Sequence, residues 1–202
     1  MLRHLDPIDR TFLAQADSAC RAAVAASHLP RAGTIHVGLE GESVWVVTHK
    51  LSEFCTSVER LAWAQESGCP WLGLTTAFAA HGGLEVLQWA RANHCPWDAR
   101  TCASAARDGH LEVLQWAQEH GCPWDSATCT EAAAGGHLDV LRWAREHDCP
   151  WVSSTCLCAA MNGHLDVLRW ARANGCPWSK GFCEYGAMRH PETLAWVQAQ
   201  PE

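Results

Sequence analysis

Apolar and polar positions alternate with helical spacing in a short stretch that recurs along most of the chain. In the copy at residues 110–120, the polar side chains fall on one arc of a helical wheel: Glu112, Gln115, Gln118 and Glu119. The apolar side chains fall on the opposite arc, with Leu111 as an exception beside the turn: Val113, Leu114, Trp116 and Ala117. This pattern predicts an amphipathic helix from about His110 to about His120. Gly121 and Pro123 follow it as stop signals.

An alanine-rich stretch precedes this helix and predicts a partner helix. Asp98 stands where an N-cap belongs, and the stretch ends at Gly109, a residue type common just after helices. Asp125 is the N-cap expected in the following copy, and Ser153 and Ser179 take that place in the later ones. The elements therefore come in pairs, in which an Ala-rich first helix is followed by an amphipathic second helix.

Tryptophan, with 12 of 202 residues, marks the period of this pattern. One row, with steps of 26 or 27 residues, consists of Trp45, Trp71, Trp97, Trp124, Trp151 and Trp178. A second row with the same steps consists of Trp63, Trp89, Trp116, Trp143, Trp170 and Trp196. We expect six tandem units, near residues 45–70, 71–96, 97–123, 124–150, 151–177 and 178–202. The Trp residues stand among Pro, Ala and Leu, and this setting predicts indole rings buried between stacked helix pairs.

Small, polar and aliphatic residues also keep fixed places in each unit. In the third unit they are Thr101, Ala105-Ala106, Gly109-His110-Leu111 and Val113-Leu114. This set resembles the ankyrin repeat, although Cys102 and Ser104 replace the Pro and His of its T-P-L-H motif. The unit is about six residues shorter than the usual 33, which is about the size of the family's β-hairpin finger. The resemblance covers residues 45–202. It implies an all-α, right-handed solenoid of about six helix pairs that binds another macromolecule through one face.

Residues 1–32 lie outside the period and predict two helical pieces. Their Leu5-Asp6-Pro7-Ile8-Asp9 turn and the later Cys20-Arg21 pair resemble the second half of an F-box. The opening helix of that family has no counterpart, since the chain starts at Met1. The resemblance implies that residues 1–32 contact a ubiquitin-ligase adaptor, and the alternative is a helical cap on the array. Residues 33–44 are expected to form a linker.

The first helices carry different residues in different units, whereas the Trp, Leu and Ala-Ala positions barely change. We interpret this variable first-helix row as the surface that contacts a protein partner. Its residues are Ala103, Ser104, Arg107, Asp108, Thr130, Glu131, Leu157, Met161, Asn162, Glu184 and Tyr185. The alternative is drift on a solvated face.

Cysteine is as abundant as tryptophan, with 12 residues, and is also periodic. No C-x-x-C occurs, and equivalent cysteines of adjacent units are expected about 8–10 Å apart, too far for a disulfide or a shared zinc ion. Within a unit, Cys122 and Cys129 are expected to approach each other. We interpret the cysteines as small apolar core residues. The alternative function is a metal-binding or redox-responsive thiol protein that uses the periodic cysteines.

Three histidines, His110, His137 and His164, each follow a glycine at the start of a second helix. Equivalent copies favour a structural role, in which a ring nitrogen ties neighbouring turns together, over one catalytic base with its own partner. The chain also lacks G-x-S-x-G, G-x-x-x-x-G-K-[ST] and H-E-x-x-H motifs. We therefore expect no enzyme activity, no catalytic residues, no cofactor and no resident metal.

The charge balance narrows the class of partner. The chain has 15 Lys and Arg residues against 22 Asp and Glu, a formal net charge of −7. The clustered basic surface that binds phosphate backbones is therefore not expected, and neither is nucleic-acid binding. No apolar stretch reaches the roughly 18 residues of a membrane span, and no secretory signal stands at the start. We expect a monomeric cytoplasmic or nuclear scaffold that binds another protein. The F-box resemblance implies a substrate-recognition subunit of a ubiquitin ligase.

Overall fold

The computed structural model describes residues 55, 57–66 and 73–201. Within these residues the chain is all-helical, with eleven α-helices, one 3-10 helix and no strand, which confirms the predicted all-α class. The chain divides into two compact parts, residues 1–96 and residues 97–202. None of the described helices has the length and apolar character needed to cross a bilayer.

The first part contains helices α4 (Val58–Glu66), α5 (Gly73–His81) and α6 (Leu84–Ala92). Helix α6 packs against both α5 and α4. The core of this first part includes Leu61 from α4, Ala79 from α5 and Leu87 from α6, each at most 1% exposed. The hydroxyl of Thr76 donates to the carbonyl of Pro96 at 2.9 Å and so fastens α5 to the chain that follows α6.

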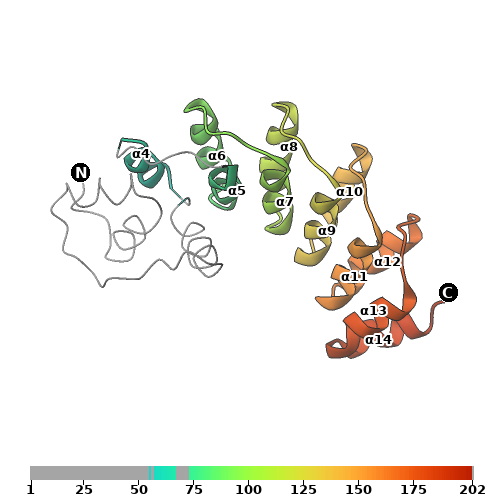
Figure 1. The fold of residues 1–202 in the computed structure, drawn as a ribbon. Helices are drawn as coiled ribbons and strands as arrows, with labels where there is room; N and C mark the ends of the chain where they lie inside the picture. The colour runs from blue at the N-terminus through green and yellow to red at the C-terminus, as the bar shows by residue number, and fades with distance from the viewer. Residues whose placement is uncertain (1–54, 56, 67–72, 202) are drawn as a thin grey trace, which may run out of the picture. The chain divides into compact units, whose positions relative to one another are not determined.

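The second part consists of helix pairs that follow one another in chain order (Figure 1). The first helices are α7 (Ala99–Arg107), α9 (Ser126–Gly135), α11 (Ser153–Met161) and α13 (Lys180–Gly186). The second helices are α8 (Leu111–Glu119), α10 (Leu138–Glu146), α12 (Leu165–Ala173) and α14 (Pro191–Gln198). The 3-10 helix η2 (Ala187–Arg189) precedes α14.

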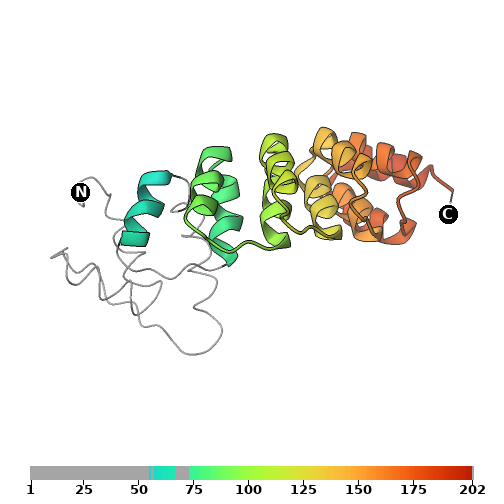
Figure 2. The ribbon, with the colours of Figure 1, turned by 90° about the horizontal axis from the view of Figure 1, so that it is seen from above.

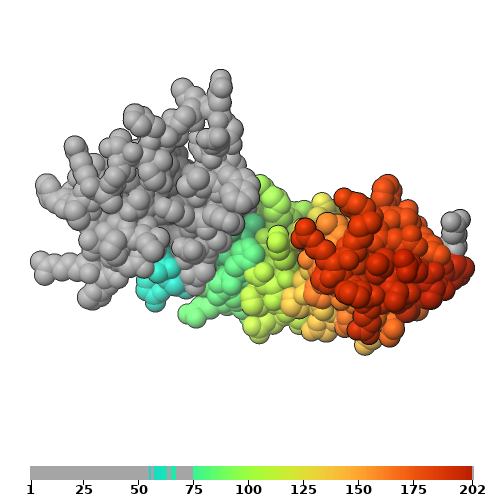
Figure 3. Space-filling model, turned by 90° about the horizontal axis from the view of Figure 1, so that it is seen from below, coloured from blue at the N-terminus to red at the C-terminus, as the bar shows by residue number. Residues whose placement is uncertain are grey.

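Each first helix of this second part packs against its own second helix and against the next first helix. Successive second helices contact one another much less. Figure 2 shows the pairs from above, and the space-filling view in Figure 3 shows the same succession from the green residues near 100 to the red residues near 200. The first helices thus form the tightly packed side of the second part, and the second helices form a looser side.

The core of the second part explains this difference in packing. The second helices bury Val113, Leu114, Ala117 and their counterparts Val140, Leu141, Ala144, Val167, Leu168 and Ala171 completely. The first helices bury mainly small residues, namely Cys102, Ala105, Ala106 and their counterparts Cys129, Ala132, Ala133, Cys156, Ala159 and Ala160. Since alanine and cysteine side chains are short, neighbouring first helices can approach closely.

The helix starts confirm part of the predicted capping. The carboxylate of Asp98 accepts a hydrogen bond from the Arg100 backbone N–H at 2.9 Å, and the carboxylate of Asp125 accepts one from the Ala127 N–H at 2.8 Å. Ser179 occupies the N-cap position of α13, but its side chain makes no capping hydrogen bond. The prediction for Ser153 is wrong, because α11 already begins at that residue and Val152 is the N-cap.

The turns between paired helices confirm the structural role predicted for His164, one of the three histidines. Gly136 has a φ of +78°, and the ring of His164 lies over it so closely that an added Cβ would be 2.5 Å from Nδ1. The ring nitrogen Nε2 of His164 then donates to the Ala134 carbonyl at 3.1 Å. Gly109 meets the ring of His137 in the same way. The His164 ring therefore ties the turn of its own pair to the end of the preceding first helix, and the His137 ring packs against the turn of the preceding pair.

Several predictions from the sequence lie outside the described residues. They are the F-box-like segment at residues 1–32, the linker at residues 33–44, and the first tryptophans of the two rows, Trp45 and Trp71, with the side chain of Trp63.

Candidate binding surfaces

The structure separates the variable first-helix row into packed and exposed residues. Ala103 is only 8% exposed, so the prediction that it contacts a partner is wrong. The hydroxyl of Thr130 on α9 lies 3.3 Å from those of Ser154 and Thr155 on α11. The side chain of Leu157 lies against α13, where it would be 3.1 Å from a Cβ added at Gly186. This position of the row is used in packing between neighbouring first helices.

The rest of the row faces solvent to different degrees. Ser104, Glu131 and Glu184 are half-buried, while Arg107, Asp108, Met161, Asn162 and Tyr185 are exposed. The guanidinium of Arg107 lies 3.7 Å from the Glu131 carboxylate on the next first helix. The row is therefore charged over α7 and α9 and becomes apolar toward α11 and α13.

The apolar end of the row is an exposed patch of four large side chains, here called the apolar patch. Phe182, Tyr185 and Met188 are 68%, 72% and 63% exposed. They are spaced three residues apart, so they share one side of α13 and η2. Met161, 54% exposed, joins them because its side chain lies against Gly186 of α13. Exposed apolar clusters of this kind mark interaction sites.

Phe182 and Met188 were not among the predicted contact residues, although the sequence holds a signal for Phe182. It stands in the last first helix at the place where earlier units have Thr101, Thr128 and Thr155, which are completely buried. A large aromatic residue at a position that otherwise holds a small buried one marks a difference between the last unit and the others.

The tryptophans of the second part lie along a partly exposed edge, so the prediction of buried rings holds only in part. All tryptophans with described burial, in both parts, are half-buried: Trp89, Trp97, Trp116, Trp124, Trp143, Trp151, Trp170, Trp178 and Trp196. In the second part, the Trp of each second helix meets the Trp before its first helix edge to face, with ring centroids 5.8 to 6.4 Å apart. The rings cover the margin of a core whose centre is Val, Leu and Ala.

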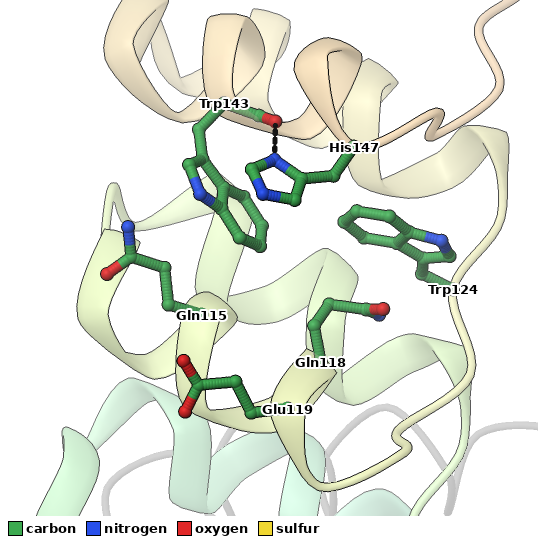
Figure 4. Close-up of a pocket in the computed structure, with 6 residues that line it drawn as sticks. All are labelled: Gln115, Gln118, Glu119, Trp124, Trp143 and His147. Atoms are coloured by element: carbon green, nitrogen blue, oxygen red, sulfur yellow. Dashed lines mark hydrogen bonds between the residues drawn. The ribbon is translucent and has the colours of Figure 1, made fainter.

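A pocket of about 520 Å³ lies on this edge between α8 and α10 (Figure 4). Helix α8 contributes three of its lining residues, and the other three come from the loop before α9 and from α10 and its end: Gln115, Gln118, Glu119, Trp124, Trp143 and His147. The His147 ring stacks on Trp143 at 4.2 Å, and its Nδ1 donates to the Trp143 carbonyl at 2.8 Å. None of the six lining residues is Lys or Arg, and the Glu119 carboxylate brings a negative charge.

The described cysteines are core residues, as predicted. All are free thiols, and every one except the half-buried Cys158 is at most 3% exposed: Cys55, Cys95, Cys102, Cys122, Cys129, Cys149, Cys156, Cys176 and Cys183. The Cys122 thiol interacts with the thiol of Cys102 on the first helix of the same unit, and the Cys149 thiol interacts with that of Cys129 in the same way. The described part of the chain shows no group of three or more His, Cys, Asp or Glu residues placed to hold a metal ion.

Burial of these thiols predicts a loss of stability at alkaline pH. Burial raises the pKa of Cys183 to about 11, from 9.0. Below pH 9 both folded and unfolded chains keep this proton; as the pH rises toward 11 only the unfolded chain loses it, so stability falls. We expect this residue to cost about 2 kcal/mol between pH 8 and pH 10.5, measured by urea unfolding. Cys183→Ala should lose correspondingly less over that range, and equal losses in the two proteins would contradict the assignment.

Comparisons of the whole sequence with protein-family models and with curated proteins find no match.

Proposed function

We propose that the chain is a non-enzymatic protein-binding scaffold of the ankyrin type, with its target bound along the first-helix row. The observation that carries this proposal is the apolar patch formed by Met161, Phe182, Tyr185 and Met188 on α11, α13 and η2. Large apolar side chains exposed together on one side of a helix gain free energy when a partner covers them.

The pattern of constant and variable positions supports the same function. Residues that pack the helix pairs recur from unit to unit, whereas the exposed first-helix positions change from charged to apolar along the second part. A graded surface of this kind gives a partner both an apolar anchor and polar contacts, which is the composition of protein interfaces. Arg107, Asp108 and Asn162 are the polar contacts in this proposal.

The F-box resemblance of residues 1–32 adds a second element to the proposal. A target bound along the first-helix row and an adaptor bound by residues 1–32 would together make the chain a substrate-recognition subunit of a ubiquitin ligase. The two contacts use separate segments, so each can be lost without the other.

The experiment is affinity purification of the tagged full chain, followed by mass spectrometry. The double variant Tyr185→Ser/Met188→Ser removes much of the apolar patch without touching the core, since both side chains are more than 60% exposed. We expect it to recover the target about tenfold less well than the wild type. The matched control is Arg100→Ser/Gln198→Ser, which changes two exposed residues outside the patch and should recover the target normally.

Two results would contradict these proposals separately. Equal recovery of every co-purifying protein by the patch variant and the control would remove the patch as a binding site. Absence of ubiquitin-ligase adaptors from the wild-type sample, or their undiminished recovery after deletion of residues 1–32, would remove the ligase role and leave the scaffold intact.

A further inference from the structure

The intervals between successive second helices in the second part differ in whether the chain's own cations cover the tryptophans. In the interval between α10 and α12, the Arg145 guanidinium lies 4.4 Å from the Trp151 ring centroid and Arg142 lies 5.9 Å from that of Trp170. The interval between α12 and α14 repeats this arrangement. There Arg172 lies 4.1 Å from Trp178, and Arg169 lies 5.9 Å from Trp196.

The interval between α8 and α10 has glutamine at both of these places. Gln118 stands 27 residues before Arg145, and Gln115 stands 27 residues before Arg142. The tryptophans that correspond to Trp151 and Trp170 are Trp124 and Trp143. These two indoles line the 520 Å³ pocket (Figure 4). The pocket therefore lies where the other intervals hold two guanidinium groups.

Gln118 keeps one of the two contacts that arginine makes at this position. Its Nε2 donates to the Cys122 carbonyl at 2.9 Å, as the guanidinium of Arg145 donates to the Cys149 carbonyl. The amide is too short and carries no charge, so the attraction of a cation to the face of Trp124 is missing. The hydrogen bond to the Cys122 carbonyl is thus preserved. Among the described residues, no cation of the chain covers the Trp124 ring, so a group from another molecule can occupy that place.

The polar atoms around the pocket suit a cation. The Glu119 carboxylate is negative, and the side-chain oxygen of Gln118 is an acceptor, because its amide nitrogen already donates to the backbone. His147 uses Nδ1 as a donor to the Trp143 carbonyl, and when Nδ1 alone carries a proton, Nε2 is also an acceptor. Planar guanidinium stacks on indole faces and donates five N–H groups in the plane, which fits two rings lined by acceptors.

We propose that this pocket binds the guanidinium group of an arginine side chain from a partner polypeptide. The proposal rests on the proposed scaffold function and names a second contact for the same partner, on the second-helix side. The occupant is identified by the chain itself, because Arg145 and Arg172 show which group covers the equivalent tryptophan when the sequence supplies it.

The test is a titration of the full chain with the blocked peptide Gly-Arg-Gly. The NMR signals of the indole N–H groups monitor binding. Trp124→Phe and Trp143→Phe assign the two pocket signals, which we expect to shift in a saturable way. A peptide with citrulline in place of arginine keeps the shape and removes the charge. It should bind about tenfold more weakly, as should the lysine peptide.

Gln118→Arg is the decisive variant, since it places the chain's own guanidinium over Trp124, as Arg145 is placed over Trp151. We expect its affinity for the arginine peptide to fall about tenfold while its melting temperature stays at or above that of the wild type. The matched control is Gln198→Arg, at the corresponding place in α14, which adds the same charge with no tryptophan after it. This variant should bind the peptide like the wild type.

Three outcomes would overturn the proposal. Equal binding of the citrulline peptide would show that charge is not recognised, and equal or tighter binding of the lysine peptide would exclude a guanidinium site. An equal loss of affinity for the arginine peptide in Gln118→Arg and Gln198→Arg would show that only the added overall charge weakens binding. The titration uses purified protein and a peptide, so its failure is distinguishable from failure of the scaffold proposal, which depends on recovery of a partner through the apolar patch.

Discussion

Leu114→Ala is expected to destabilise the second part by about 3 kcal/mol or more, the largest effect of any single truncation to alanine on α8. The Leu114 side chain of α8 is completely buried in the core, so truncating it to alanine leaves a cavity. Trp116→Ala on the same helix should cost less, about 2 kcal/mol, because the half-buried indole keeps part of its surface in water. Urea unfolding followed by circular dichroism at 222 nm measures both values.

Two surface substitutions calibrate this ranking. Arg107→Ala removes an exposed ion pair at 3.7 Å and should change stability by less than about 1 kcal/mol. Glu112→Ala, an exposed residue on α8 itself, should stay within about 0.5 kcal/mol of the wild type. A larger loss for Trp116→Ala than for Leu114→Ala would contradict the structure and restore the view that the indoles are the main core residues.

The helices themselves could be predicted because their signals are local. The predicted span from His110 to His120 contains α8, and the carboxylates of Asp98 and Asp125 cap α7 and α9 as expected. Hydrophobic spacing, an acidic cap and a glycine with positive φ act within one or two turns of chain, so the sequence carries them directly.

The exposure of the tryptophans could not be predicted from the same helical wheel. Trp116 shares the apolar arc with Val113 and Leu114, but at about 100° per residue it lies roughly 60° from the first and 160° from the second, at the margin of the arc. How much of a margin is covered depends on the neighbouring pair. The second helices stand apart, so the rings remain partly in solvent.

The two proposed binding surfaces depend on contacts between units, and sequence variation alone does not show which variable residues make such contacts. The variable position that holds Ala103 and Thr130 is used in packing between first helices, while Tyr185, one position further along its own first helix, is exposed. The change from arginine to Gln118 is visible in the sequence. Its meaning depends on knowing that an arginine at this place covers the tryptophan that follows its helix.

Gly135→Ala is expected to destabilise the second part by about 2–3 kcal/mol, the opposite of the usual effect of this change within a helix. Gly135 is the last residue of α9, and an added Cβ would lie 2.2 Å from the Arg107 carbonyl oxygen at the end of α7. Backbone at this distance cannot rotate away as a side chain would, so the two first helices would have to separate.

Gly181→Ala is the matched control for that effect. Gly181 lies in α13, is exposed, and would place its new Cβ within 4 Å of no atom beyond its chain neighbours and its own helix backbone. There the substitution should stabilise the protein by about 0.5–1 kcal/mol, since alanine favours the helix over the unfolded chain. Urea unfolding of the two variants beside the wild type measures both shifts. A gain in stability for Gly135→Ala would show that α7 and α9 do not approach as closely as the structure has them, and would contradict the tight packing of the first helices.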